Sequence, residues 1–260
     1  MSMLEKYQTA IINFIWSPIL AWGLGALFLA DHPALWIGFI MLMVTPCTDW
    51  YLLFTAMAKG NTALSTTILP VNLMLQMVLL PVYLYIFAGA IQPVPLSIIG
   101  QSMIVVLVLP FALAHLTRYA LRKKAHLLND RLIPFFTNAQ MIFLSLAIMA
   151  MFASQGNRLL DNLEVIYILI LPMVLFFFIN FILAQVMGRH MQFSYEDTAS
   201  LSLTIIARNS PVALAIAVTA FPDEPLIALA LVIGPLIELP VLMLVSQILL
   251  LVRKTHVGRA

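Results

Sequence analysis

Long apolar runs, each about 20 residues or more, repeat along the chain and are separated by short polar segments. An α-helix needs about 20 apolar residues to cross the hydrocarbon core of a bilayer. The short connections force neighbouring helices to run antiparallel and leave no room for a soluble domain. The pattern therefore predicts an all-α polytopic membrane protein, with about eight transmembrane helices in one transmembrane domain over residues 1–260. The predicted spans lie near 11–30, 35–57, 64–88, 98–121, 132–152, 165–187, 198–221 and 226–252.

Two of these runs are interrupted near their middle by proline and polar residues. The second run is interrupted at 45–50, around Pro46, and the seventh at 207–211, which ends on Pro211. Proline removes a backbone donor and clashes with the preceding helical turn, and hydroxyl or amide side chains satisfy the freed carbonyl groups. We predict two broken helices with their inner ends at membrane depth, where secondary transporters bind substrates and coupling ions. The other interpretation is a pair of proline kinks that aid helix packing.

The two interruptions indicate an internal repeat. They lie five spans apart, and an odd offset reverses the orientation in the membrane, so the repeat would be inverted. The third span carries Pro70 followed by Asn72, and the eighth carries Pro235 followed by Glu238. Spans one to three then correspond to spans six to eight. Spans four and five have no counterparts upstream, so we expect two helices to be missing at the N-terminus.

Composition excludes a soluble globular protein, because 63% of the residues are hydrophobic and 9% are charged, with a mean hydropathy of +1.04. A soluble chain of this length cannot cover so much apolar surface. Eleven Lys and Arg residues fall on one side of the predicted spans, and Arg158 alone falls on the other. The positive-inside rule then places both termini in the cytoplasm of a multi-pass cell-membrane protein. The basic loop at 118–131 is interpreted as a signal for topology and lipid contact rather than for nucleic acid.

Three charged residues lie at predicted membrane depth, namely Asp49, Arg208 and Glu238. A charge at the centre of a membrane helix costs at least ~2.5–3.5 kcal/mol unless it is paired, neutralised or hydrated. We expect the three to meet in a polar cavity, with Arg208 pairing with Asp49 or Glu238; a packing ion pair without a transport role is the alternative. A fixed guanidinium can replace a bound sodium ion electrostatically and does not deprotonate. Proton coupling would then fall to a carboxyl group, Glu238 first and Asp49 second.

Uncharged polar side chains near the interruptions are the candidates for substrate binding. They are Thr48, Asn72, Asn209 and Ser210. Asn13 and Asn180, in spans one and six, could contribute amide groups in the same way. Cys47 is the single cysteine, so no intramolecular disulfide forms, and it is either a small apolar filler or a ligand. No serine–histidine pair, paired aspartates or zinc-protease motif lies at membrane depth, so we predict no catalytic residues, no enzyme and no cofactor.

Three segments together resemble the arsenite efflux permeases of the bile acid/sodium symporter superfamily. Residues 234–241 resemble the motif of their last helix, residues 45–48 their cysteine-bearing broken helix, and residues 207–215 their second broken helix. The resemblance extends over roughly 11–252. It implies an inverted-repeat fold of ten spans, with two broken helices that cross at the centre, and by that template this sequence begins at the third span.

The resemblance implies a secondary active transporter for arsenite or antimonite efflux, with exchange for protons as the coupling hypothesis. Soft arsenic(III) favours thiolate ligands, so Cys47 would be its ligand. The sequence departs from the arsenite permeases at Val212, where they carry glutamate. It departs from the sodium symporters at Thr204 and Arg208, where they carry glutamate and glutamine, which argues against the usual sodium sites. Two alternatives stay open: a carrier of organic anions such as bile-acid-like or keto acids, which Arg208 favours, and a non-transporting truncated remnant.

Overall fold

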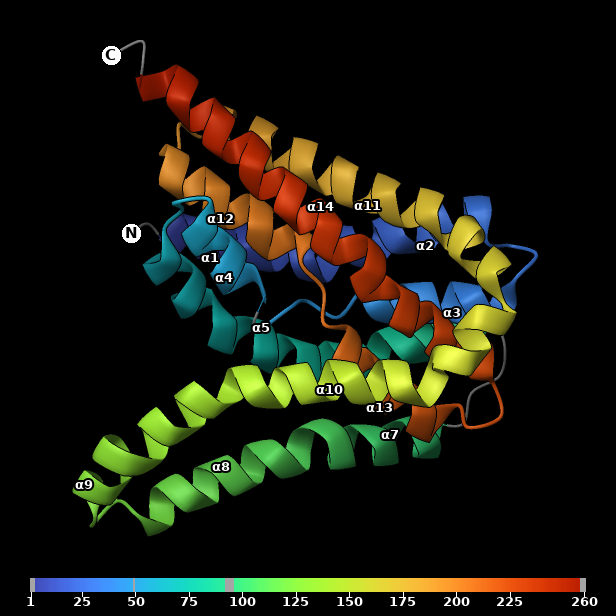
Figure 1. Cartoon of the computed structure of the whole chain (residues 1–260), viewed down its shortest axis with the longest axis horizontal. Coiled ribbons are helices and arrows are strands. Elements are labelled where there is room, and N and C mark those ends of the chain that lie inside the picture. The colour runs from blue at the N-terminus through green and yellow to red at the C-terminus, as the bar shows by residue number, and fades with distance from the viewer. Residues whose placement is uncertain (1–2, 49, 92–95, 258–260) are drawn as a thin grey trace.

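Residues 3–48, 50–91 and 96–257 are described by the structure, a computed structural model, and they form helices joined by short connections (Figure 1). Within the described residues, six continuous helices are long and apolar enough to cross a membrane. Several of them contain a π-helical turn, labelled η. The six are α1 (Met3–Ile11) with η1 (Ile12–Trp16) and α2 (Ser17–Phe28); α5 (Thr62–Tyr83) with η2 (Leu84–Ala88) and α6 (Gly89–Ile91); α7 (Leu96–Met103) with η3 (Ile104–Val108) and α8 (Leu109–Ala120); α9 (Ala125–Leu127) with η4 (Leu128–Leu132) and α10 (Ile133–Asp161); α11 (Leu163–His190); and α14 (Pro225–Val257).

The other two passes are broken helices, as the sequence predicts. One consists of α3 (Pro33–Met43) and α4 (Trp50–Met57), and the other of α12 (Tyr195–Ile206) and α13 (Ser210–Ala220). Each half-helix has 8 to 12 residues, which span only about 12–18 Å at 1.5 Å per residue, too short to cross a bilayer alone. Six continuous and two broken passes therefore confirm the prediction of an all-α polytopic membrane protein.

Several predicted boundaries differ from the structure, among them the start of the first span, whose helix begins at Met3 rather than near residue 11, and the end of the fifth. The fifth span, predicted near 132–152, is part of a helix that continues to Asp161. The apolar run ends at Phe152, but the polar residues after it include no proline, so the backbone continues as a helix. Arg158 therefore lies in the last turn of α10 rather than in a loop.

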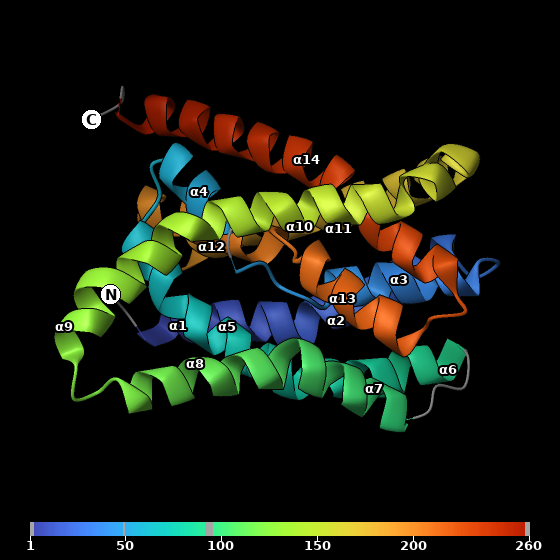
Figure 2. The same cartoon turned by 60° about the horizontal axis from the view of Figure 1, so that its bottom comes forward.

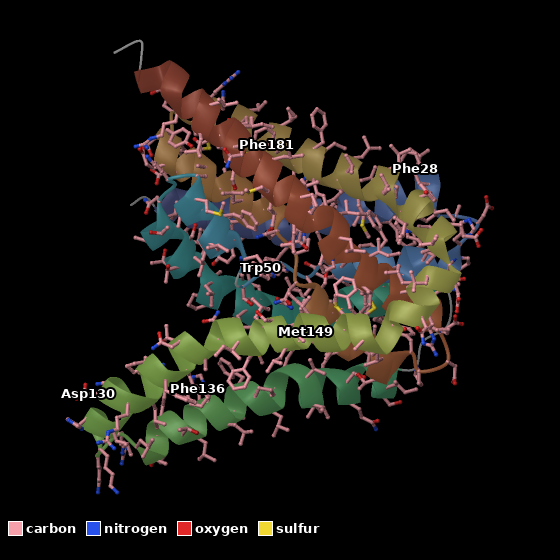
Figure 3. The ribbon with its side chains drawn as sticks, viewed as in Figure 1. Phe28, Trp50, Asp130, Phe136, Met149 and Phe181 are labelled. Atoms are coloured by element: carbon pink, nitrogen blue, oxygen red, sulfur yellow. The ribbon has the colours of Figure 1, made fainter. Side chains whose placement is uncertain are left out.

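The arrangement of the helices places the broken pairs inside the bundle. The N-terminal end of α1, the C-terminal end of α14 and the turn at α9 all lie at the left of Figures 1 and 2, as an even number of passes requires. Both views place α8 along the lower edge of the molecule, and Phe136 and Met149 are labelled along α10 in Figure 3. None of the described residues of α8 is buried, so its apolar side chains are suited to contact with hydrocarbon.

Proline explains three of the four π-helical turns. Each of η1, η3 and η4 ends two residues before a proline, namely Pro18, Pro110 and Pro134. A proline inside a helix offers no N–H and crowds the carbonyl four residues earlier. In η1 the wider turn lets the Ser17 N–H donate to the carbonyl of Ile12, five residues back. The carbonyl of Phe14, which Pro18 leaves without its helical donor, accepts a hydrogen bond from the Tyr83 hydroxyl of α5.

We expect Tyr83→Phe to lower the free energy of unfolding by about 1–3 kcal/mol, because it leaves the buried carbonyl of Phe14 without that donor. The measurement is denaturant-induced unfolding of the purified protein in detergent. Tyr85→Phe is the matched control, since Tyr85 lies in η2 two residues away and is 54% exposed. Equal stability of the two variants would show that the Phe14 carbonyl does not need the hydroxyl.

Candidate functional site at the crossing of the broken helices

The two breaks lie side by side and pair through their backbones. In Figure 1 the connection between α3 and α4 and the connection between α12 and α13 meet near the middle of the molecule. Pro46 and Arg208 form an isolated antiparallel bridge. The Cys47 N–H donates to the carbonyl of Ala207 at 3.0 Å, and the Asn209 N–H donates to the carbonyl of Thr45 at 2.8 Å. Backbone groups that the helices leave free at membrane depth are thus satisfied by each other, as hydrocarbon surroundings require.

Pro46 fits this bridge because the two hydrogen bonds are made by the neighbours of the bridged residues. Pro46 and Arg208 face each other as a non-hydrogen-bonded pair, a position whose N–H points away from the partner segment. A proline at this position therefore costs no hydrogen bond between the two segments. Arg208, however, has an outward N–H that needs an acceptor, and the carboxylate of Glu238 in α14 provides it at 2.7 Å. Glu238 is 2% exposed, so its first role is to complete the hydrogen bonding of the break.

The Arg208 side chain is fully buried, with 0% exposure. Its Nη1 donates to Asn13 Oδ1 at 3.5 Å, and its Nη2 donates to Ser17 Oγ at 3.2 Å and to the Ile205 carbonyl at 2.5 Å. The guanidinium carbon lies 4.9 Å from the centre of the Phe176 ring, a cation–π distance. The guanidinium therefore links the first, sixth and seventh spans.

Of the two predicted ion pairs of Arg208, with Asp49 or with Glu238, the one with Glu238 does not form. No carboxylate of the described residues lies within 4.0 Å of the guanidinium. The reason is the extended backbone of the break, which sends the N–H of Arg208 toward α14 and its side chain toward η1 and α2. The other predicted partner, Asp49, lies outside the described residues.

Cys47, Thr48 and Asn209 connect the two breaks. The Cys47 side chain is 2% exposed, and its Sγ accepts a hydrogen bond from the N–H of Trp50 at 3.2 Å, at the start of α4; Trp50 is labelled near the middle of Figure 3. Asn209 Nδ2 donates to Thr48 Oγ1 at 3.2 Å. Asn209 Oδ1 accepts from the N–H of Val212 and so caps α13.

Ser210 and Pro211 begin α13 close to α14. Proline suits the first turn of a helix, where the missing N–H has no helical partner anyway. A Cβ added at Gly234 would lie 2.6 Å from Ser210 Oγ, so the glycine of the predicted last-helix motif allows the two helices to approach. Ser210 is 1% exposed, and its hydroxyl has no hydrogen-bond partner among the described residues.

The ends of the broken helices on the α9 side are also fixed to each other. Asn61 Nδ2 donates to Asp197 Oδ1 at 2.8 Å, and the Asn61 N–H donates to the carbonyl of Glu196 at 2.9 Å. The Tyr195 hydroxyl donates to the carbonyl of Ala58 at 2.8 Å. Because these bonds join the segment after α4 to the start of α12, they hold the register in which the two breaks meet.

Most of the predicted site residues come together at the crossing, and the structure adds others. Those that meet there are Pro46, Cys47, Thr48, Arg208, Asn209, Ser210, Pro211 and Glu238. Asn72 is buried in α5, with no hydrogen bond to a described residue. Ser17 and Phe176, which contact the Arg208 guanidinium, were not predicted as site residues from the sequence. Both stand four positions from a buried asparagine, Asn13 and Asn180, so helical spacing from those asparagines was the available signal.

Comparison with known proteins identifies the family. Residues 7–162, more than half of the chain, match the model of the Sodium Bile acid symporter family. The chain belongs to the sodium bile acid symporter family. This agrees with the resemblance found in the segments around both breaks and in the last helix.

Three members or relatives of this family align over most of the chain. An uncharacterized transporter of Synechocystis is 27% identical over 81% of this chain and 56% of its own length. The arsenical-resistance protein Acr3 of Corynebacterium glutamicum is 26% identical over 89% of this chain and 66% of its own length. The Acr3 protein of Alkaliphilus metalliredigens is 22% identical over 81% of this chain and 60% of its own length. The chain thus spans between about half and two thirds of the length of these relatives.

The crossing of this symporter-family chain combines a thiol and neutral polar groups with the charged residues Arg208 and Glu238. Among the described residues, no group of three or more His, Cys, Asp or Glu side chains could hold a metal ion. Cys47 supplies one sulfur, while Thr48 and Asn209 supply a hydroxyl and an amide beside it.

Proposed function

We propose that the chain acts as a secondary active transporter that exports arsenite or antimonite across the cell membrane, with both termini cytoplasmic. The observation that carries the proposal is the position of Cys47, whose sulfur lies in the paired backbone segments where the two broken helices meet. Trivalent arsenic and antimony are soft and prefer sulfur ligands. One thiol captures such a solute weakly enough to release it, which transport requires. Thr48, Asn209 and Ser210 would surround it with hydroxyl and amide groups.

The position of Arg208 favours the metalloid over an organic anion. A cation at the crossing would suit a carboxylate substrate if its guanidinium were available. Instead the guanidinium is fully buried, and its two terminal nitrogens donate to Asn13, Ser17 and the carbonyl of Ile205, while Nε has no partner among the described residues. The names of two relatives, arsenical-resistance proteins, point the same way.

Exchange for protons is the coupling that we propose. The guanidinium of Arg208 holds a permanent positive charge among oxygen atoms of the first and seventh spans, where a sodium ion would otherwise be needed. Glu238 is then the candidate for the proton. One of its oxygens accepts the Arg208 N–H in either protonation state, and the other can gain or lose a proton without breaking that bond.

The test is arsenite uptake into everted membrane vesicles prepared from a bacterial host that lacks arsenite exporters. We expect uptake when the vesicle interior is made acidic in sodium-free buffer, and its collapse when a protonophore is added. The matched variant Glu238→Gln keeps the acceptor for the Arg208 N–H and removes the titrating group, so it should reduce gradient-driven uptake by about a hundredfold or more, the effect typical of a lost proton-transfer group.

The alternatives give different results in the same vesicles. Uptake that needs sodium and ignores the pH gradient would overturn proton exchange. Uptake of a keto acid without uptake of arsenite would assign the chain to the organic-anion carriers. Absence of transport for both solutes, in vesicles that contain the folded protein, would support a non-transporting form.

A further inference from the structure

Asn72 is a buried amide whose polar atoms have no hydrogen-bond partner among the described residues. It lies in the middle of α5 with 0% exposure, and neither Nδ2 nor Oδ1 has a hydrogen-bond partner among the described residues. Leaving both groups of an amide unbonded in an apolar interior costs several kcal/mol, of the order of 1–3 kcal/mol for each group. The helix α5 packs against α4 and α12, the halves of the two broken helices that lie on the α9 side of the breaks. An uncompensated amide in this place needs an explanation.

Helix lengths put Asn72 at the same level, relative to its break, as Glu238. The half-helix α4 has 8 residues and α13 has 11, and each is followed by a four-residue connection, 58–61 and 221–224. Asn72 is the eleventh residue of α5, and Glu238 is the fourteenth residue of α14. In each half, the position number of the polar residue in the helix that follows exceeds the length of the preceding half-helix by three residues. The two polar residues therefore lie at the same level relative to the start of their half-helices. The inverted repeat therefore makes Asn72 the counterpart of Glu238.

Glu238 and Asn72 differ in their hydrogen bonding because the second break has a backbone N–H that the first break lacks. Glu238 accepts the outward N–H of Arg208. The bridge partner of Arg208 is Pro46, and the reciprocal hydrogen bonds on the two sides of the bridge make Pro46 its counterpart in the other half of the repeat. Proline has no N–H, so the first break offers nothing for Asn72 to accept. Pro46, which stands where the second break has Arg208, thus leaves the amide of Asn72 without a donor from the backbone of the first break.

We propose that Asn72 binds the transported solute directly, with Oδ1 accepting from it and Nδ2 donating to it. The amide is neutral and offers one acceptor and two donors, so it selects a small uncharged solute that carries hydroxyl groups. Trivalent arsenic in neutral water is such a solute, a trihydroxide. The inference rests on the proposed function and adds to the Cys47 sulfur a second, hydrogen-bonding contact that distinguishes a hydroxylated metalloid from a bare soft cation.

The experiment compares Asn72→Leu with wild type in detergent, using sodium arsenite as the probe and the thermal unfolding midpoint as the readout. We expect arsenite to raise the midpoint of the wild type, and Asn72→Leu to need about tenfold more arsenite or more for the same rise, the factor expected for loss of about one net hydrogen bond. Without arsenite, the midpoint of Asn72→Leu should equal or exceed that of the wild type, because an unpaired buried amide is replaced by an apolar group of similar size.

Gln76→Leu is the matched control, since Gln76 is a second buried amide one turn further along the same face of α5. It should bind arsenite within about twofold of the wild type. Equal loss of binding in both variants, or a lower midpoint of Asn72→Leu without arsenite, would overturn the proposal, because either result means that Asn72 serves helix packing. Absence of any arsenite effect on the wild type would instead refute the proposed function, so the two failures are distinguishable.

Discussion

Cys47→Ser is expected to bring arsenite uptake into everted vesicles down to the level of vesicles without the protein. Serine has nearly the same size as cysteine, and its oxygen can accept the N–H of Trp50 that the sulfur accepts. The fold at the start of α4 should therefore persist. What is lost is the soft ligand, since a hydroxyl oxygen is a hard donor that trivalent arsenic does not prefer. The chain contains no second cysteine to take its place. Metalloid sensitivity of an exporter-deficient host that carries the variant should match that of the empty host.

Met43→Leu provides the sulfur control for this result. Met43 is the last residue of α3 and is fully buried, so it is a sulfur close to the same break in sequence. A methionine-to-leucine change conserves volume and usually costs less than about 1.5 kcal/mol. We expect Met43→Leu to retain uptake. If Cys47→Ser also retained uptake, with the same dependence on arsenite concentration as the wild type, the thiol would not be the ligand. The proposed substrate would then have to be reconsidered.

Helix number and helix breaks could be predicted from the sequence because both depend on local properties. The length of an apolar run decides whether a helix can cross the bilayer, and prolines such as Pro46 and Pro211 act on their own turn. The end of α10 could not be predicted in the same way. Hydropathy changes at Phe152, but the helix stops only at Asp161, because polarity alone does not end a helix.

The contacts of the site depend on the directions in which backbone groups and side chains point, and these directions cannot be derived from the sequence. Sequence reasoning brought Arg208 and Glu238 together correctly, but it assigned the contact to the guanidinium. In the structure the backbone of Arg208 meets Glu238, and its side chain reaches Asn13 and Ser17. The backbone pairing of the breaks was equally hidden, because it joins residues about 160 positions apart through groups that every residue carries. The proton-coupling role of Glu238 stays a prediction.

Arg208→Gln is expected to destabilise the protein in sodium-free buffer and to make its stability depend on sodium. Glutamine removes the charge and leaves Asn13 Oδ1, Ser17 Oγ and the Ile205 carbonyl without the donors that they have in the structure. Loss of several buried, charge-assisted hydrogen bonds should cost roughly 3–5 kcal/mol of unfolding free energy. The oxygens that remain are ligands of the kind that hard cations prefer. Sodium that binds the folded state should then recover part of the loss, in proportion to the logarithm of its concentration.

Unfolding midpoints in sodium chloride and in choline chloride of equal ionic strength measure this effect. Wild type should respond equally to the two salts, because its guanidinium already supplies the positive charge. Arg208→Lys separates charge from hydrogen bonding: it keeps a cation at the crossing, so it should lose stability without gaining a preference for sodium. Arg253→Gln, near the end of α14, controls for the general effect of removing an arginine. An Arg208→Gln protein with the same midpoint in both salts would show that the guanidinium joins helices without standing in for a sodium ion, and proton exchange would lose its electrostatic argument.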